Sequence, residues 1–271
     1  MERNMKFSRE YEVRGFEIDE NYHLKPYHIA SYFQDAMAQN FADNMLAAYD
    51  LQKEGRTWVL SDLCIDFLHQ MPRWRTSVLV ETWVSSIRGF RLTIDFRVSD
   101  SRGTPISQGS SSWVIVKKPG NRPEKIEPYA RKLGEPHSPL YPGYRFHEPD
   151  LDGSPSPLPY GACGLRHPWE EDQKAWSICQ PIRSYDIDFN GHVSNIRYIA
   201  GAVEAIPVEL RSSLRPSSFR IKYLREAVLD QVLVSEVRTV HEDSDAIEYH
   251  HILKECESAV EFSRMVSVWK R

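Results

Sequence analysis

The chain has 271 residues, of which 41% are hydrophobic and 27% charged, so it can form one large domain or two smaller ones. A formal charge of −4 does not indicate the basic face that a nucleic-acid-binding protein needs. No apolar run approaches the roughly 18 residues that a membrane span requires, so we expect neither nucleic acid as a partner nor a membrane span.

The N-terminal residues and the cysteines indicate the cellular compartment and whether a metal or other cofactor is bound. Residues 1–7 contain no apolar signal-peptide core and no Arg- and Ser-rich transit pattern. Scattered thiols in a chain of this size are typical of a reducing compartment. None of the four forms a C-x-x-C pair, the usual indication of a zinc or redox site: Cys64, Cys163, Cys179 and Cys256. The sequence therefore predicts a cytoplasmic protein without a metal or other cofactor.

The first half predicts a strand, a loop, a helix and four more strands. The strand is expected at 7–16 and the loop at 17–26. Apolar residues then recur at helical spacing from 27 to about 49, at Ile29, Phe33, Met37, Phe41 and Met45. From residue 57 the apolar pattern has period two, which predicts strands at 57–69, 77–87, 90–98 and 106–116.

A Pro-, Gly- and Ser-rich stretch from about 119 to 172 follows these strands. A structureless loop of that length is uncommon inside one domain, so we interpret the stretch as an inter-domain connection with a short helix near 127–133. The predicted boundaries are an N-terminal domain at 1–135, a connection at 136–172 and a C-terminal domain at 173–271.

The second half repeats the element order of the first. A strand is expected at 175–184, a loop at 185–192, a helix at 194–206, and strands at 218–228, 232–239, 246–255 and 259–269. The two loops also match in sequence: 13–24 and 182–193 share Arg, Ile, Asp, Asn and His at a constant offset. We infer a duplicated α+β domain whose antiparallel sheet is covered by its helix. Two such units can pair edge to edge as a pseudo-dimer within one chain.

The second loop carries the strongest chemical signal. Asp188, Asn190 and His192 alternate, and in an extended segment alternate side chains face the same side. Ser194 or Asn195 then starts the helix, whose first N–H groups could stabilise an oxyanion. The alternative is that the Asp and Asn side chains only order a turn.

Glu226 lies near the end of the expected strand 218–228, beside apolar residues. A partly desolvated carboxylate has a raised pKa and can act as a general base. The alternative is a solvated strand-end glutamate paired with Arg225.

Several motifs together resemble one enzyme family. Residues 188–199 read DFNGHVSNIRYI, which resembles the D-x-N-x-H-V-N-N-x-x-Y-I stretch of bacterial and plant acyl-acyl-carrier-protein thioesterases. Residues 223–227, YLREA, are similar to a later strand of that family ending in R-E-C, and Trp58-Val59 matches a W-V pair in its first half. The resemblance covers nearly the whole chain apart from the Pro-rich connection.

The resemblance implies two tandem hot-dog domains and hydrolysis of fatty-acyl thioesters on acyl carrier protein, a reaction of fatty acid biosynthesis and lipid metabolism. It also implies a catalytic group of Asp188, Asn190, His192 and Glu226, with a supporting role for Glu204. Two positions depart from the family pattern. Ser194 replaces the first Asn of a pair, and Ala227 stands where many plant members carry Cys, so no thiol nucleophile exists there.

We expect direct attack by water, with Glu226, or Glu226 with His192, as the base. The rival is attack by Asp188 through an anhydride. The first half carries a copy of the loop, Asp19, Asn21 and His23, but Gln70 stands where Glu226 stands in the second half, which predicts a weakened first site. Candidate acyl-tunnel residues are apolar, with core packing as the alternative: Phe33, Met37, Phe41 and Trp58.

Three other functions stay open at this point. They are an acyl-CoA thioesterase, a hot-dog 3-hydroxyacyl dehydratase and a non-catalytic module that binds an acyl carrier. Asn190 counts against the dehydratase, which needs a His–acid pair without a water-orienting amide. The expected partner is acyl carrier protein, and the expected assembly is a monomer or a homodimer.

Overall fold

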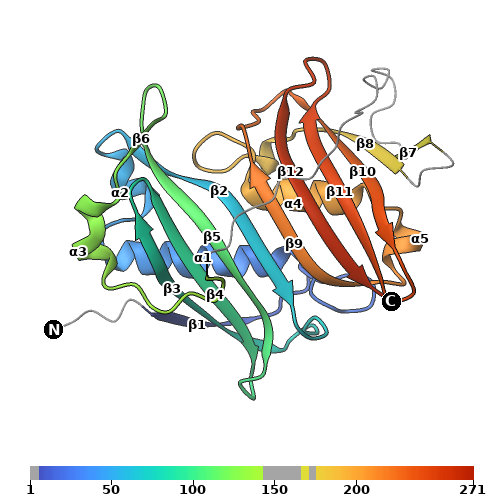
Figure 1. The fold of residues 1–271 in the computed structure, drawn as a ribbon, viewed down its shortest axis with the longest axis horizontal. Helices are drawn as coiled ribbons and strands as arrows, with labels where there is room; N and C mark the ends of the chain where they lie inside the picture. Colours follow the sequence, from blue (N-terminus) through green and yellow to red (C-terminus); the bar gives the residue numbers. More distant parts are fainter. Residues whose placement is uncertain (1–5, 143–165, 171–174) are drawn as a thin grey trace. The chain divides into compact units, whose positions relative to one another are not determined.

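Each half of the chain forms an antiparallel sheet with one main helix packed on it (Figure 1). The computed structural model describes residues 6–142, 166–170 and 175–271. The chain divides into two compact units, Met1–Arg145 and Phe146–Arg271. We refer to them as the first and the second unit.

The first unit contains a sheet in the order β1-β3-β4-β5-β2, with β6 paired to β5. Its elements are β1 (Phe7–Glu12), α1 (Tyr27–Asp43), α2 (Ala48–Gln52), β2 (Arg56–Phe67), β3 (Ser77–Arg88), β4 (Arg91–Asp100), β5 (Pro105–Lys117), β6 (Arg122–Glu124), η1 (Glu127–Tyr129) and α3 (Ala130–Leu133). Helix α1 contacts β1 and β3 with its apolar face, so the core lies between helix and sheet. The expected strands and the short helix are present.

Helix α1 ends at Asp43, earlier than the predicted residue 49. The Asn44 side chain donates to the carbonyl of Asn40 (2.8 Å), and Met45 adopts a left-handed φ of 52°. A left-handed residue terminates a helix, because it turns the chain away from the helical path. Met45 is 67% exposed, so its expected place on the buried stripe was wrong.

The second unit contains a sheet in the order β9-β12-β11-β10-β8-β7. Its elements are β7 (Arg166–Glu170), β8 (Ala175–Pro181), η3 (Ser184–Asp186), α4 (Asn195–Glu204), α5 (Val208–Arg211), β9 (Arg215–Tyr223), β10 (Val232–Glu242), β11 (Ala246–Glu255) and β12 (Glu261–Lys270). Helix α4 contacts β10, β11 and β12. The expected strand 218–228 ends early, at Tyr223, which leaves Glu226 on the loop that follows.

The two units share one topology, which confirms the predicted duplication. Read from its other edge, the first sheet is β2-β5-β4-β3-β1, which matches β9-β12-β11-β10-β8 strand for strand. Local bonds repeat as well. Leu68 N–H and His69 N–H donate to one carbonyl at 2.8 and 3.2 Å, and Leu224 and Arg225 do the same at 2.8 and 3.2 Å. An antiparallel sheet packed on one long helix is the hot-dog arrangement that the resemblance implied.

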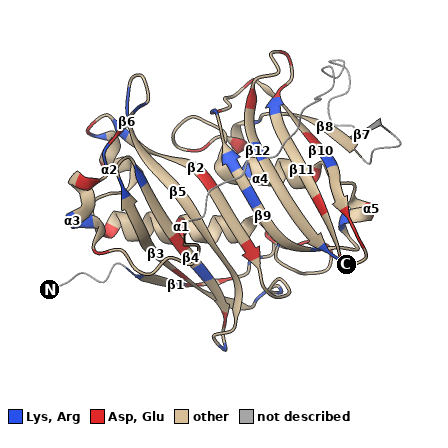
Figure 2. Cartoon of the chain, viewed as in Figure 1, with Lys and Arg blue, Asp and Glu red and all other residues tan. Residues whose placement is uncertain are grey.

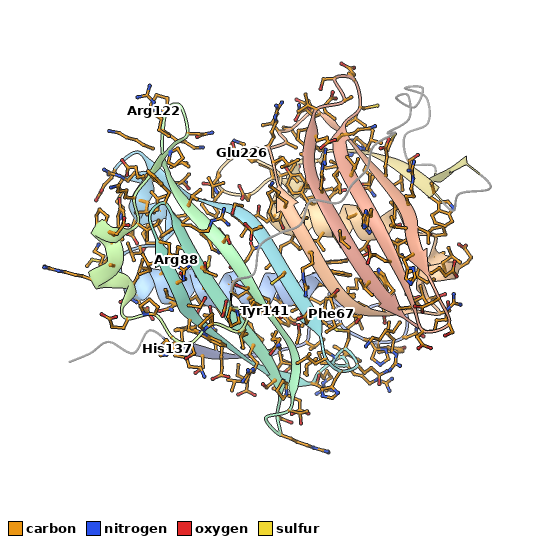
Figure 3. The ribbon with its side chains drawn as sticks, in the orientation of Figure 1. Phe67, Arg88, Arg122, His137, Tyr141 and Glu226 are labelled. Atoms are coloured by element: carbon orange, nitrogen blue, oxygen red, sulfur yellow. The ribbon has the colours of Figure 1, made fainter. Side chains whose placement is uncertain are left out.

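The start of the predicted connection is bound to the first unit. His137 N–H donates to the carbonyl of Val84 (2.8 Å), and the Tyr141 hydroxyl donates to Asp66 Oδ2 (2.6 Å). Figure 3 labels both residues over the strands of this sheet. Strand β7 falls inside the predicted connection, and most of the rest of it, 143–165 and 171–172, lies outside the described residues. The boundaries 1–135, 136–172 and 173–271 stay predictions.

Charged side chains of both signs are mixed along the two units. On the side of each unit drawn in Figure 2, Lys and Arg are interspersed with Asp and Glu. Among the described residues, no helix combines the length and the apolar character that crossing a membrane requires.

Candidate active site

The loop between β8 and α4 is fixed by one acidic side chain. Asp186 Oδ2 accepts the Arg183 N–H at 2.9 Å, and Asp186 Oδ1 lies 2.8 Å from Arg197 Nε on α4. The Asp186 carbonyl accepts the Ser194 N–H at 2.9 Å. Because one residue bonds both ends of the loop, it closes residues 183–194 into a rigid corner.

Residues 188–192 form a tight turn within this corner. Asp188 N–H donates to the carbonyl of His192 (2.8 Å), and Asp188 Oδ1 accepts the Asn190 N–H (2.8 Å). Gly191 has a φ of 81°, a conformation that glycine adopts without strain. The expectation of an extended segment was therefore wrong. The Asp188 side chain orders a turn, as the alternative interpretation held.

The loop after β9 brings Glu226 to this turn. Val193 N–H donates to the carbonyl of Ala227 (2.9 Å), which ties the two loops together. Glu226 Oε2 then lies 3.2 Å from His192 Nε2. The structure thus brings the imidazole of His192, rather than the guanidinium of Arg225, to the Glu226 carboxylate. Figure 3 labels Glu226 on its loop in the second unit.

Both members of this pair are open to water. The side chains of Glu226 and His192 are 38% and 21% exposed. Glu226 lies on a loop rather than on an apolar strand, because β9 ends three residues earlier, and its partly covered carboxylate keeps access to water. The pair can therefore meet a water molecule.

Tyr198 on α4 joins the same group, although its role was not predicted. Its hydroxyl oxygen accepts the Ala227 N–H at 2.8 Å. Burial, helped by the negative charges of Glu226 and Asp188 and opposed by the hydrogen bond from the Ala227 N–H, raises the pKa of Tyr198 to about 12. The signal that could have found it is the tyrosine of the family-like stretch 188–199. Glu204, the expected supporting residue, lies at the C-terminal end of α4, 3.2 Å from Arg211.

The N-terminus of α4 differs in part from expectation. Ser194 is the N-cap residue, but its side chain makes no capping hydrogen bond. Its N–H is donated to the Asp186 carbonyl, so this amide cannot also receive an oxyanion. The next amides, of Asn195 and Ile196, belong to the first turn, where helix geometry provides no intrahelical acceptor.

The four candidate tunnel residues are buried in the first unit. The Phe33 ring stacks on Phe96 with centroids 4.0 Å apart, and Phe41 lies 5.2 Å from Trp58. Trp58 Nε1–H donates to the carbonyl of Leu46 (2.8 Å). The structure thus brings Phe41 and Trp58 together as core residues, with Met37 buried on the same helix.

The first unit contains the matching corner without the carboxylate. Gln70 Nε2 lies 3.1 Å from His23 Nε2, and Asp19 Oδ1 accepts the N–H groups of Asn21 and His23, both at 2.9 Å. The predicted correspondence of Gln70 with Glu226 is therefore present in space. An amide cannot accept a proton as a base, so this corner lacks a group that the second corner has.

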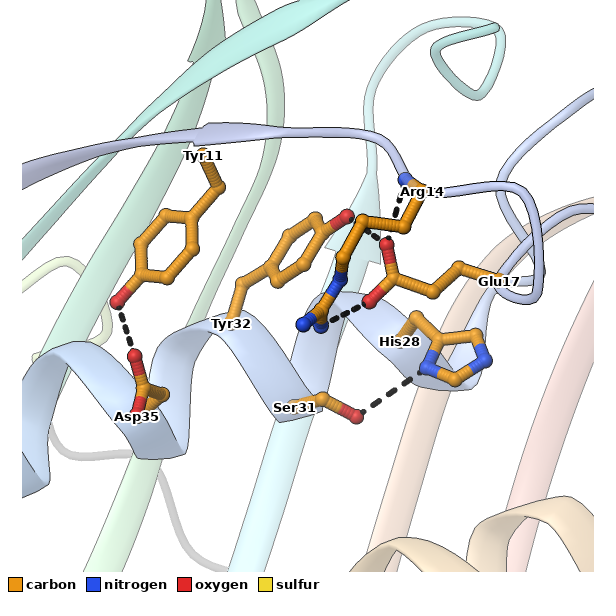
Figure 4. A network of polar contacts seen from close by, with 7 residues as sticks. All are labelled: Tyr11, Arg14, Glu17, His28, Ser31, Tyr32 and Asp35. Atoms are coloured by element: carbon orange, nitrogen blue, oxygen red, sulfur yellow. Dashed lines mark hydrogen bonds and ion pairs between the residues drawn. The ribbon is translucent and has the colours of Figure 1, made fainter. Parts of the chain in front are cut away.

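A buried glutamate anchors the first corner (Figure 4). Glu17 Oε2 accepts the Arg14 N–H at 2.9 Å and the Tyr32 hydroxyl at 2.5 Å, and the Arg14 guanidinium pairs with the same carboxylate. Burial alone would raise the pKa of Glu17, but the hydrogen bonds from Arg14 and Tyr32 outweigh it and hold the pKa below its usual value. Glu17 thus occupies the position of Asp186 in the second corner.

Two relatives are similar to this chain in sequence. The chain is 25% identical to a palmitoyl-acyl carrier protein thioesterase of Gossypium hirsutum over 84% of its length, and it spans about half (54%) of that relative. It is 24% identical to an oleoyl-acyl carrier protein thioesterase of Arabidopsis thaliana, covering 100% of this chain and 77% of the relative.

Two solved structures have the same fold. An acyl-ACP thioesterase from Bacteroides thetaiotaomicron superposes with a TM-score of 0.77 at 22% identity, covering 99% of both chains. The 12:0-ACP thioesterase from Umbellularia californica superposes with a TM-score of 0.76 at 19% identity, covering 98% of this chain and 95% of that chain. The acyl-ACP thioesterase N-terminal domain matches residues 4–133, and the C-terminal domain matches residues 170–271. The chain therefore belongs to the acyl-ACP thioesterase family.

Proposed function

We propose that this chain hydrolyses fatty-acyl thioesters of acyl carrier protein and releases the free fatty acid, with its chemistry at the corner of the second unit. The observation that carries the proposal is the 3.2 Å contact between His192 Nε2 and Glu226 Oε2, beside the turn of Asp188 and Asn190. Membership of the acyl-ACP thioesterase family supports the reaction type. Relatives named as acyl carrier protein thioesterases support the substrate class.

The proposed mechanism is attack by water on the thioester carbonyl. Glu226, alone or with His192, accepts the proton of the water as the C–O bond forms. The tetrahedral oxyanion is stabilised by the amides at the start of α4, those of Asn195 and Ile196. It then collapses as the C–S bond breaks, and the thiolate of the carrier takes up the proton.

Asn190 and Asp188 have separate parts in this proposal. The Asn190 amide orients the water or the thioester carbonyl, while Asp188 holds the turn through its bond to the Asn190 N–H. Attack by the Asp188 carboxylate through an anhydride is disfavoured, because one of its oxygens is already engaged in holding the turn. Incorporation of ¹⁸O from solvent water into Asp188 during a single turnover would favour that route instead.

The test replaces the base and its counterpart. Glu226→Gln keeps the size of the side chain and removes the proton acceptor, so kcat should fall by at least about 10²-fold. Gln70→Ala in the first unit should leave kcat within about twofold. Hydrolysis of one acyl chain on carrier protein and on CoA would be measured for both variants. Turnover of Glu226→Gln near that of the parent protein would reject the proposal, and faster hydrolysis of the CoA thioester would move the substrate to acyl-CoA.

Two further expectations belong to the same proposal. Phe33, Met37, Phe41 and Trp58 would line the tunnel for the acyl chain, supported by their apolar character and their burial. A cytoplasmic location is supported by the cysteine spacing, since four scattered cysteines without a C-x-x-C pair are typical of a reducing compartment.

A further inference from the structure

The loop that carries Glu226 is held on both sides of that residue. Before it, the N–H groups of Leu224 and Arg225 donate to the carbonyl of Phe262 on β12. After it, the Ala227 N–H donates to the Tyr198 hydroxyl at 2.8 Å, and the Ala227 carbonyl accepts from Val193. Of these contacts, the bond to Tyr198 is the one that a side chain makes.

The described residues of the first unit show no counterpart of this side-chain bond. The bonds before the glutamine repeat, since Leu68 and His69 donate to the carbonyl of Ile106. At the offset that aligns the two corners, however, Ile29 stands in the place of Tyr198. An isoleucine side chain has no oxygen to accept an N–H. The phenol is thus present in the unit with the carboxylate and absent from the unit with the amide.

The electrostatic setting explains why a phenol suits this place. Tyr198 is 2% exposed, and both Glu226 and Asp188 act on it through their charge. A carboxylate acceptor here would add a third negative charge beside these two, which like-charge repulsion opposes. A neutral hydroxyl accepts the Ala227 N–H without that cost and satisfies a buried donor that would otherwise be left unpaired.

We infer that Tyr198 is a positioning residue for thioester hydrolysis, because its hydroxyl oxygen fixes the Ala227 amide and so keeps the neighbouring Glu226 carboxylate against His192. The inference rests on the proposed function, in which Glu226 is the base. It requires no contact between Tyr198 and the substrate. Misplacement of a reacting group by about 1 Å can cost around 10²-fold in rate, so loss of this bond should be visible in kcat.

The test compares two tyrosines that differ in what their hydroxyls hold. Tyr198→Phe removes the oxygen that holds Ala227. Tyr32→Phe is the matched control, because the Tyr32 side chain is equally buried and its hydroxyl donates to Glu17 Oε2 (2.5 Å) in the first unit, whereas the proposed oxyanion site lies in the second. We expect Tyr198→Phe to lower kcat by about 10- to 100-fold with KM within about twofold. Tyr32→Phe should lower kcat by less than about threefold, with a similar loss in Tm.

A double-mutant cycle separates positioning from general stabilisation. In the Glu226→Gln background, Tyr198→Phe should lower the single-turnover rate by less than about threefold, because the base that it positions is already gone. Multiplicative losses, or equal losses of kcat for Tyr198→Phe and Tyr32→Phe in the parent protein, would overturn the inference while the proposed function stands. Normal turnover of Glu226→Gln by itself would instead overturn the proposed function, and the inference with it.

Discussion

The corners of the two units have nearly the same backbone and different chemistry. Asp19 N–H donates to the carbonyl of His23 at 2.8 Å, and Asp188 N–H donates to the carbonyl of His192 at 2.8 Å. Isolated β-bridges close both corners, Ile18 with Leu24 and Ile187 with Val193. The histidine contacts are also alike, at 3.1 Å to Gln70 and 3.2 Å to Glu226. The comparison teaches that the hot-dog corner forms without the carboxylate that we propose as the base, because the backbone of a fold and the chemistry of its side chains are separable.

The side chains that differ are the proposed base and the residue that holds its loop. Glu226 and Tyr198 in the second unit are replaced by Gln70 and Ile29 in the first. The turn differs as well, because Tyr22 takes a φ of 65° where Gly191 takes 81°. A tyrosine in this region is uncommon and costs conformational energy that glycine avoids.

The largest effect should come from the two histidines. His192→Ala removes the partner of the proposed base, and kcat should fall by at least about 10²-fold. His23→Ala removes the same ring beside Gln70 and should change kcat by less than about twofold. Steady-state hydrolysis of acyl carrier protein thioesters measures both variants. Equal losses would show that the corners share the chemistry, and would end the functional contrast between them.

A smaller effect should appear in the free energy of unfolding when Glu17 or Asp186, the carboxylates that fix the two corners, is replaced. Glu17→Gln removes a fully buried carboxylate that accepts the Tyr32 hydroxyl and pairs with the partly exposed Arg14. Disturbing the buried hydrogen bond of Tyr32 should cost about 1–3 kcal/mol, while the Arg14 guanidinium keeps its contact with water. Asp186→Asn should cost less than about half of this, because the Asp186 side chain is 16% exposed whereas that of Glu17 is fully buried. Urea denaturation followed by circular dichroism would test the order, and a larger loss for Asp186→Asn would reverse it.

The smallest effect concerns pH and a buried histidine of the second sheet. Burial, with the charge of His250 second, lowers the pKa of His251 to about 3. The unfolded chain therefore binds more protons than the folded one between about pH 6.5 and 3, so stability present above pH 6.5 is lost as the pH falls. His251 changes the free energy of unfolding by at most about 1.4 kcal/mol per pH unit.

Strand register gives the matched control for this effect. The first unit has the pair Phe96 and Gly109 where the second has His251 and Met265. Phe96 does not titrate, so the first unit lacks this contribution. His251→Gln should flatten the dependence of Tm on pH between 4 and 6. An unchanged slope in that variant would assign the acid sensitivity to other groups.

The sequence predicted much of the architecture, because local pattern and local structure agree along most of the chain. Period-two apolar patterns place β3 and β11 to within a residue, since those strands bury alternate side chains. The repeated loop predicted the duplication that the strand orders confirm. The ends of elements were predicted less well. Asn44 and Met45 end α1 through a cap and a left-handed residue, which the apolar pattern does not encode.

By itself, the sequence determined the duplicated α+β fold and the residue types at both corners, because both follow from the order and spacing of residues that are near one another in the chain. Only the tertiary structure decided which groups meet. Glu226 reaches His192 through two loops joined by the bond from Val193 to Ala227, and Tyr198 holds that junction from a helix. Contacts between residues 29 to 34 positions apart depend on how separate elements pack, and no pattern of neighbouring residues specifies that packing.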